Sequence, residues 1–184
     1  MEDKISKFLV KCLWVTLVLY AIRIWISFPE SVYDWIGAAG DAISVSLIIM
    51  GAYAGFLWRI NPFEKTPKFM GRYSGKIFYC YKGVSGEKET SVIVKQTLLS
   101  VKVQIKTNEI TSNTIVGDIV EENGEYALYY TYITNPKIKY SKENPIQRGT
   151  CRLVKNNKKE LNGIYWTSRN TTGDIELKKK SRRE

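Results

Sequence analysis

In the later part of this 184-residue chain, the side chains best suited to bind a ligand are tyrosines, threonines and one arginine, Arg169. The chain has twelve tyrosines and no histidine, which excludes Ser-His-Asp, Cys-His and histidine-based zinc sites. Carboxylates are scattered over turn-like segments such as GEKE and EEN, and no glycine-rich phosphate loop is present. The composition therefore predicts a binding protein and not an enzyme, with no catalytic residues, metal or cofactor.

Alternating side chains indicate the elements that position these residues. The segment GRYSGKIFYCYK changes character at every second residue, as half-buried strands do. Turn signals such as EENGE and RNTTGD separate the strands. With no helix between them, eight antiparallel strands predict a sandwich or a barrel, and we expect an eight-stranded barrel that can hold one small ligand. The expected strands are 71–82, 90–97, 99–107, 112–121, 125–134, 148–155, 160–168 and 172–179.

The bulkier alternating set is expected to face the barrel interior. The tyrosine rings can simply fill a core, or they can stack on a bound base. Polar residues in phase with them are the better indication of a site. The expected inward set is Tyr73, Tyr79, Val101, Val103, Ile105, Tyr126, Leu128, Tyr130, Tyr132, Leu161, Tyr165, Ile175 and Leu177, with polar Gln96, Ser112, Thr114, Thr150, Thr167 and Arg169 in phase.

Two long apolar runs precede the strands. Residues 8–28 are long enough to cross a bilayer as a helix, and residues 42–58 carry no charge and extend back toward Ser31. Pro29 ends the first run, so the two form a helical hairpin. A cleaved signal peptide is the competing interpretation, but the run is long for one and lacks a small-residue cleavage site before Pro29.

Charge sets the expected orientation and domain plan. Lysines precede the first run and basic residues follow the second, while FPESVYD between them has neither Lys nor Arg. Both termini and the barrel are therefore expected in the cytoplasm, with reduced cysteines. The net charge of +10 belongs to residues 61–184 and favours an anionic ligand. The expected domains are a transmembrane hairpin (1–60), a linker (61–68), the barrel (69–179) and a basic tail (180–184).

Two glycines four residues apart, Gly51 and Gly55, lie in the second apolar run. Such pairs let helix backbones approach closely in lipid. They either pack the second helix against the first or form a contact between protomers.

An outer-membrane barrel is excluded, because the strand face opposite the aromatics is rich in Lys and Arg.

The order of these parts resembles a known family. An apolar hairpin precedes strands that read GRYSG, VIVKQT, YALYYTY followed by NP, RGT, and LNGIYWTSRNTTGDIEL. This order resembles the two-transmembrane β-strand-rich effectors of the cyclic-oligonucleotide-based antiphage signalling system, CBASS, over essentially the full length.

The resemblance implies a multi-pass protein of the bacterial inner membrane. A partner nucleotidyltransferase would make a cyclic dinucleotide on phage infection. The barrel would bind it, the protein would self-associate into a homo-oligomer, and the helices would disrupt the bilayer and kill the cell. By resemblance and strand phase, the expected ligand-binding residues are Tyr79, Gln96, Thr97, Ser112, Thr114, Tyr130, Tyr132, Thr167, Arg169 and Thr172, with Arg169 clasping a phosphate unless it is an exposed turn arginine.

A function of another class stays open at this point. The chain could be a membrane-anchored barrel that binds a lipid or another apolar ligand, or a non-catalytic scaffold. The polar residues in phase with the lumen favour the nucleotide sensor. No groove-reading helix or RNA-binding motif appears, so DNA and RNA are not expected partners. The tail KKKSRRE is either solvated or in contact with anionic lipid.

Overall fold

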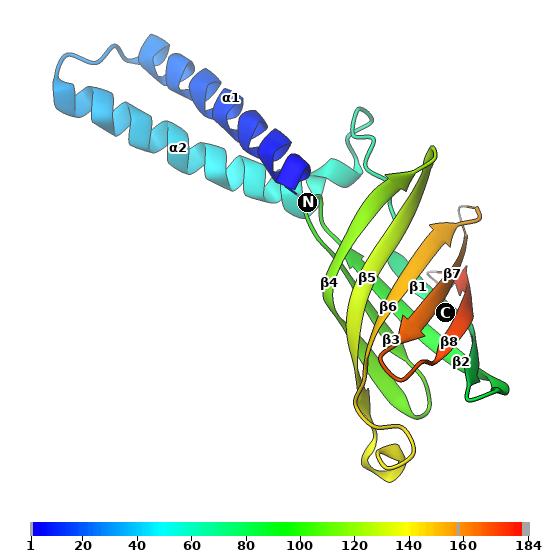
Figure 1. The fold of residues 1–184 in the computed structure, drawn as a ribbon. Coiled ribbons are helices and arrows are strands. Elements are labelled where there is room, and N and C mark those ends of the chain that lie inside the picture. The colour runs from blue at the N-terminus through cyan, green and yellow to red at the C-terminus, as the bar shows by residue number, and fades with distance from the viewer. Residues whose placement is uncertain (1, 158, 182–184) are drawn as a thin grey trace. The chain divides into compact units, whose positions relative to one another are not determined.

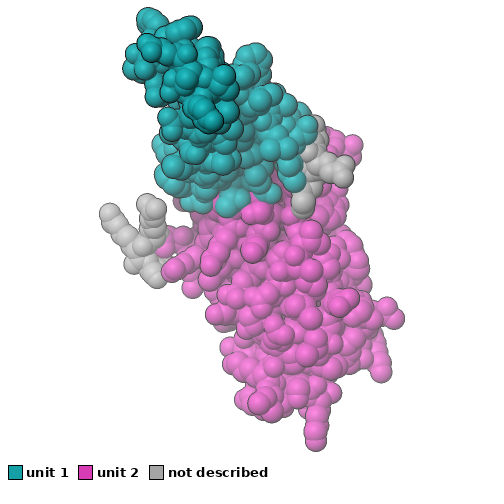
Figure 2. All heavy atoms as spheres, turned by 90° about the vertical axis from the view of Figure 1, so that its left-hand side faces the viewer, with its two compact units in different colours: residues 1–66, 97–99 teal, residues 67–96, 100–184 magenta. Residues whose placement is uncertain are grey.

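The structure is a computed structural model that describes residues 2–157 and 159–181. It forms two compact units, one of residues 1–66 with 97–99 and the other of residues 67–96 with 100–184 (Figure 2). The first is a helical hairpin and the second a barrel. Of the basic tail, residues 182–184 lie outside the described part.

The helical unit is built from α1 (Glu2–Ile26) and α2 (Val32–Gly55), which run antiparallel as a hairpin (Figure 1). Pro29 lies in the connection, and Ser31 caps α2 through a capping box with Asp34. Both helices are long and apolar enough to cross a membrane. A short 3-10 helix, η1 (Leu57–Arg59), follows them. The backbone N–H of Leu98 donates to the Ala54 carbonyl oxygen inside this unit, at 2.9 Å.

Small side chains, but not the two glycines, hold α2 against α1. The buried residues of α2 are Ala38, Ala42, Ser46 and Met50, which recur every fourth position and so share one face. The Thr16 hydroxyl of α1 donates to the Ser46 hydroxyl at 2.8 Å. A Cβ atom added to Gly51 or Gly55 would meet no atom within 4 Å. Packing between the two helices therefore does not require these glycines.

The second unit is a closed barrel of eight antiparallel strands in sequence order, with β8 paired to β1, so the predicted fold class is confirmed (Figure 1). The strands are β1 (Gly71–Tyr81), β2 (Val84–Gln96), β3 (Val101–Lys106), β4 (Ile110–Glu122), β5 (Glu125–Pro136), β6 (Arg148–Lys155), β7 (Glu160–Thr167) and β8 (Thr172–Lys179). The β5–β6 loop, yellow in Figure 1, contains a 3-10 helix, η2 (Ile138–Tyr140), and lies at one end of the barrel.

The start of β2 is the main departure from the predicted strands. Residues 84–89 were expected to be a turn, but they pair with β1 up to Tyr81↔Val84. Lys82 and Gly83, with φ of 49° and 79°, make the two-residue turn. The alternation in this stretch is hard to see because the residues facing the lumen side are Gly86 and Lys88, and neither gives an apolar signal.

The interior is aliphatic at one end of the barrel and aromatic at the other. Near the start of β1, Leu128, Leu153, Leu161 and Leu177 are fully buried with Tyr73 and Phe69. The other apolar and aromatic residues predicted to face inward, apart from Tyr79 and Tyr126, are also buried and belong to the same core cluster, which extends toward the aromatic end. Tyr79 is partly buried against the same cluster. The placement of Tyr126 in the buried interior is wrong, because this second residue of β5 is 39% exposed.

Candidate ligand pocket in the barrel lumen

A cavity of about 390 Å³ opens at the aromatic end of the barrel. It is lined by the final residues of β1, β5 and β7, by the first residues of β4, and by side chains from the β3–β4, β5–β6 and β7–β8 connections. Its volume lies in the range of small-molecule sites, which occur in the mouths of β-barrels. Strands therefore form the walls of the pocket, and loops border its mouth.

Five tyrosines form the aromatic part of the wall: Tyr79, Tyr81, Tyr130, Tyr132 and Tyr165. The rings of Tyr130 and Tyr132 are tilted against each other with centroids 5.8 Å apart. Burial raises the pKa of the Tyr130, Tyr132 and Tyr165 hydroxyls well above the usual value. These hydroxyls are therefore neutral at any physiological pH, and they can both donate and accept hydrogen bonds.

Two cations reach the pocket, and each is held on an aromatic face. The Arg169 guanidinium lies 4.8 Å from the Tyr81 ring centre, and it donates to the Tyr81 hydroxyl at 2.9 Å and to the Glu143 carbonyl oxygen at 3.1 Å. Lys88 Nζ lies 5.1 Å from the Tyr79 ring centre. Both charges are thus fixed near the mouth, where an anionic group would meet them.

Glu109 places an ionised carboxylate in the same mouth. Its Oε2 accepts from Lys88 Nζ at 2.6 Å and from Asn144 Nδ2 at 3.3 Å. The hydrogen bond from Lys88 holds the pKa of Glu109 below its usual value, so the group is an acceptor at neutral pH. A ligand with phosphates and N–H groups could use Lys88 and Arg169 for the former and Glu109 for the latter.

Two buried polar atoms of the pocket lack a well-formed hydrogen bond among the described residues, and the only partner of either is the Cys151 thiol beside the Tyr130 hydroxyl, a weak hydrogen-bonding group. They are the Tyr130 hydroxyl and Oε1 of Gln147. Buried polar groups are almost always satisfied, and leaving one unpaired costs about 1–3 kcal/mol. A polar ligand in the lumen would provide the missing partners.

The pocket brings together six of the ten ligand-binding residues predicted from the sequence. They are Tyr79, Ser112, Tyr130, Tyr132, Thr167 and Arg169. The Thr167 hydroxyl accepts from the backbone N–H groups of Arg169 and Thr171 at 3.3 Å each, and so shapes the turn that carries the arginine. Arg169 is therefore not a free turn arginine.

The other four predicted residues lie elsewhere. Gln96 is buried at the opposite end, where it accepts from the Phe69 N–H and donates to the Pro67 carbonyl oxygen, both at 2.8 Å. Thr97 lies in the β2–β3 turn, which belongs to the helical unit. The Thr114 hydroxyl accepts from the Val103 N–H and donates to the Val103 carbonyl oxygen, both at 2.8 Å, beside a bulge in β4. Thr172 lies on the outer wall of β8.

Strand phase explains the errors on the outer wall. Gly173, Ile175 and Leu177 are the inward series of β8, so Thr172 points outward. Thr150 also faces out, where its hydroxyl lies 3.4 Å from that of Thr131 on β5. Both positions had been assigned inward, and both are one residue out of phase.

Several residues of the pocket were missed by the sequence reasoning. Tyr81 and Thr134 continue the inward series of β1 and β5, so their phase could have revealed them. Lys88 was hidden in a segment predicted as a turn. Asn144 and Gln147 lie in the long β5–β6 loop, where no periodicity indicates which side chain turns inward.

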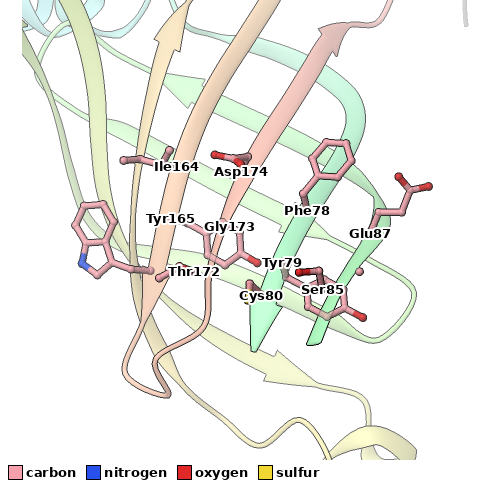
Figure 3. A pocket seen from close by; sticks show the side chains of 12 residues that line it. Phe78, Tyr79, Cys80, Ser85, Glu87, Ile164, Tyr165, Thr172, Gly173 and Asp174 are labelled. Carbon is pink, nitrogen blue, oxygen red and sulfur yellow. The ribbon is translucent and has the colours of Figure 1, made fainter. Parts of the chain in front are cut away.

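A second hollow lies on the outside of the barrel over β1, β7 and β8 (Figure 3). Phe78, Ile164 and Trp166 give it an apolar rim, and its charged lining residues are the carboxylates Glu87 and Asp174. A hollow with carboxylates and no cation is unsuited to an anion. Among the residues that the structure describes, no group of three or more Cys, Asp or Glu side chains could hold a metal ion.

Comparisons with known proteins agree with this geometry. Residues 64–179 match the model of the family described as Cap15, cyclic dinucleotide receptor domain. The chain is also similar to CD-NTase-associated protein 15 of Staphylococcus schleiferi, with 41% identity over 182 residues that cover 97% of this chain and 99% of the relative.

Proposed function

The chain belongs to the Cap15 family of CBASS antiphage effectors, and on that premise we propose that its lumen pocket binds a cyclic dinucleotide. Such a ligand offers two bases that stack on aromatic rings and two phosphates that pair with cations. The tyrosine wall, Arg169 and Lys88 suit these parts.

The observation that carries the proposal is the polar end of the lumen. Fixed cations, an ionised carboxylate and two buried, unpartnered polar atoms converge on one cavity. An apolar ligand would desolvate these charged groups and would leave the two buried polar atoms without partners, which is costly. The alternative of a lipid-binding or purely structural barrel is therefore disfavoured.

The wider cycle is part of the same proposal. A nucleotidyltransferase supplies the ligand, as the name of the relative associates that protein with a CD-NTase. The chain acts as a receptor and catalyses no reaction. Ligand binding promotes self-association in the inner membrane, with both termini and the barrel in the cytoplasm, and the assembled helices disrupt the bilayer.

The exposed face of Gly51 and Gly55 supports the self-association. It is not used within the hairpin, because an added Cβ would meet no atom within 4 Å at either position. Small residues four apart allow close backbone contact between helices in lipid. A second copy of α2 is the partner we propose for this face.

The direct test is titration of the detergent-solubilised full chain with a panel of cyclic dinucleotides by calorimetry. At least one member should bind and raise the unfolding temperature. Absence of heat and of thermal shift across the panel would refute the proposed function.

Arg169→Ala should weaken binding of the active cyclic dinucleotide by about ten- to a hundredfold, because a charge-assisted hydrogen bond contributes about 1.5–3 kcal/mol. Arg148→Ala is the matched control, since Arg148 is exposed and does not line the pocket. Equal affinities of the two variants would contradict the role of Arg169.

A further inference from the structure

A row of four cations crosses the outer wall of the barrel at the end opposite the pocket. We define the basic row as Arg72, Lys95, Lys102 and Lys180, and all four side chains are exposed. Arg72 lies in β1, Lys95 in β2 and Lys102 in β3, and Lys180 directly follows β8. The row therefore covers four consecutive strands of the closed barrel.

The sheet register places these charges next to one another. Lys95 and Lys102 are direct partners across β2 and β3. The backbone N–H of Lys180 donates to the Arg72 carbonyl oxygen at 2.8 Å, which continues the β1–β8 ladder, so these two are also opposite. Arg72 pairs with Ile93 and is thus diagonal to Lys95. Like charges directly opposite each other destabilise a sheet.

The four side chains have no direct partner in the described part of the barrel. The side chains of the four cations make no hydrogen bond or ion pair with the residues described. The next outward residues along the strands are Ser74, Ile93, Gln104 and Lys178, none of which is acidic. Elsewhere on the wall lysines are paired, as Lys76 is with Glu87 at 2.7 Å. The row is therefore a surface that an external anion would stabilise.

We propose that the basic row binds the phosphates of anionic lipid headgroups. The inference rests on the membrane placement proposed above. Arg72 is the second residue of β1 and follows the end of the first segment of the helical unit, at Thr66, by six residues. The segment Thr97–Leu99, which lies between Lys95 and Lys102 in the chain, belongs to the helical unit. The cytoplasmic leaflet is anionic and attracts basic residues near its surface.

Lysine footprinting of the full chain tests the contact. The protein is placed in nanodiscs of phosphatidylcholine alone, or of an equimolar mixture with phosphatidylglycerol, and acetylation rates are measured by mass spectrometry. Lys95, Lys102 and Lys180 should react severalfold more slowly in the anionic discs, and high salt should restore their rates. Lys82 and Lys142, exposed at the pocket end, are internal controls that should not change.

Charge reversal distinguishes a specific row from general attraction. Lys95→Glu combined with Lys102→Glu should abolish the protection of Lys180, whereas Lys82→Glu combined with Lys142→Glu should leave it intact. Equal rates in both lipids would overturn the inference. So would protection that inorganic phosphate or added RNA reproduces on phosphatidylcholine discs. Failure of the chain to enter discs would instead contradict the membrane placement itself.

Discussion

At the scale of single residues, environment decides what a tyrosine does. The Tyr73 hydroxyl is buried at the aliphatic end and donates to the Phe69 carbonyl oxygen at 2.7 Å. The Tyr130 hydroxyl is equally buried but lacks a well-formed hydrogen bond among the described residues and lies beside the Cys151 thiol, a weak partner. The Tyr73 hydroxyl therefore stabilises the fold. The Tyr130 hydroxyl slightly lowers the stability of the fold and is available to a ligand.

Tyr130→Phe should therefore leave the thermal stability unchanged or slightly raised, and should weaken cyclic dinucleotide binding about two- to tenfold, since one neutral hydrogen bond contributes about 0.5–1.5 kcal/mol. Tyr73→Phe is the matched control. It should lower the free energy of unfolding by about 1–3 kcal/mol, because the buried Phe69 carbonyl oxygen loses its donor, and should leave affinity unchanged. Thermal unfolding and calorimetry in detergent measure both. The opposite pattern would refute the division of roles.

At the scale of elements, side-chain bonds tie neighbouring strands together on the outer wall. Glu122 of β4 accepts from the Tyr129 hydroxyl of β5 at 2.6 Å, and from Nε and Nη2 of Arg152 on β6 at 3.0 and 2.8 Å. The hydrogen bonds from Tyr129 and then Arg152 hold the pKa of Glu122 below its reference value of 4.5. Three strands thus share one ionised group.

This network makes barrel stability depend on pH in a definite direction. A carboxylate whose pKa is lower in the folded state stabilises the fold above about pH 4.5, and that contribution disappears as the pH falls through the folded-state pKa. Glu122→Gln should therefore be less stable than the parent at neutral pH and should lose less stability on acidification. Thermal midpoints measured across this range test the prediction. Glu125→Gln, at the exposed first residue of β5, should follow the parent. If it matched Glu122→Gln, the network would be irrelevant.

At the scale of the whole molecule, the two proposed functions, ligand sensing and self-association, belong to different parts of the chain. All residues of the lumen pocket come from the barrel unit, and the unused glycine face belongs to α2 of the helical unit. Within the barrel, the pocket and the basic row occupy opposite ends of the same strands. A change in one part should therefore leave the local chemistry of the others intact.

The double substitution of Gly51→Leu and Gly55→Leu should preserve ligand affinity but reduce assembly and toxicity, because the branched side chains keep helix backbones apart. Arg169→Ala should weaken cyclic dinucleotide binding and reduce toxicity together. Calorimetry, native size analysis and growth of cells that co-express the nucleotidyltransferase separate the two classes. Ala38→Leu is expected to disturb the hairpin itself, because Ala38 is buried on the packed face of α2 and a larger side chain would overpack it. Unchanged toxicity of the glycine variant at equal expression would contradict the proposed contact.

Local signals in the sequence were enough for the architecture. Long apolar runs and Pro29 indicated the hairpin, and the period of two indicated eight antiparallel strands, since each pattern depends only on neighbours along the chain. Phase also placed Tyr79, Tyr130 and Tyr132 at the lumen. Where the pattern lacked apolar residues, as around Lys88, the first part of β2 was missed.

The tertiary structure decided which polar residues form the site. Gln96 and Tyr132 are both inward, yet they lie at opposite ends of the lumen, because position along the barrel depends on strand stagger and not on phase. Glu109, Asn144 and Gln147 join the pocket through loops whose conformation no periodicity encodes. The sequence by itself thus determined an apolar helical hairpin, a set of eight strands and an aromatic lumen, whereas barrel closure and loop packing determined where its charges meet.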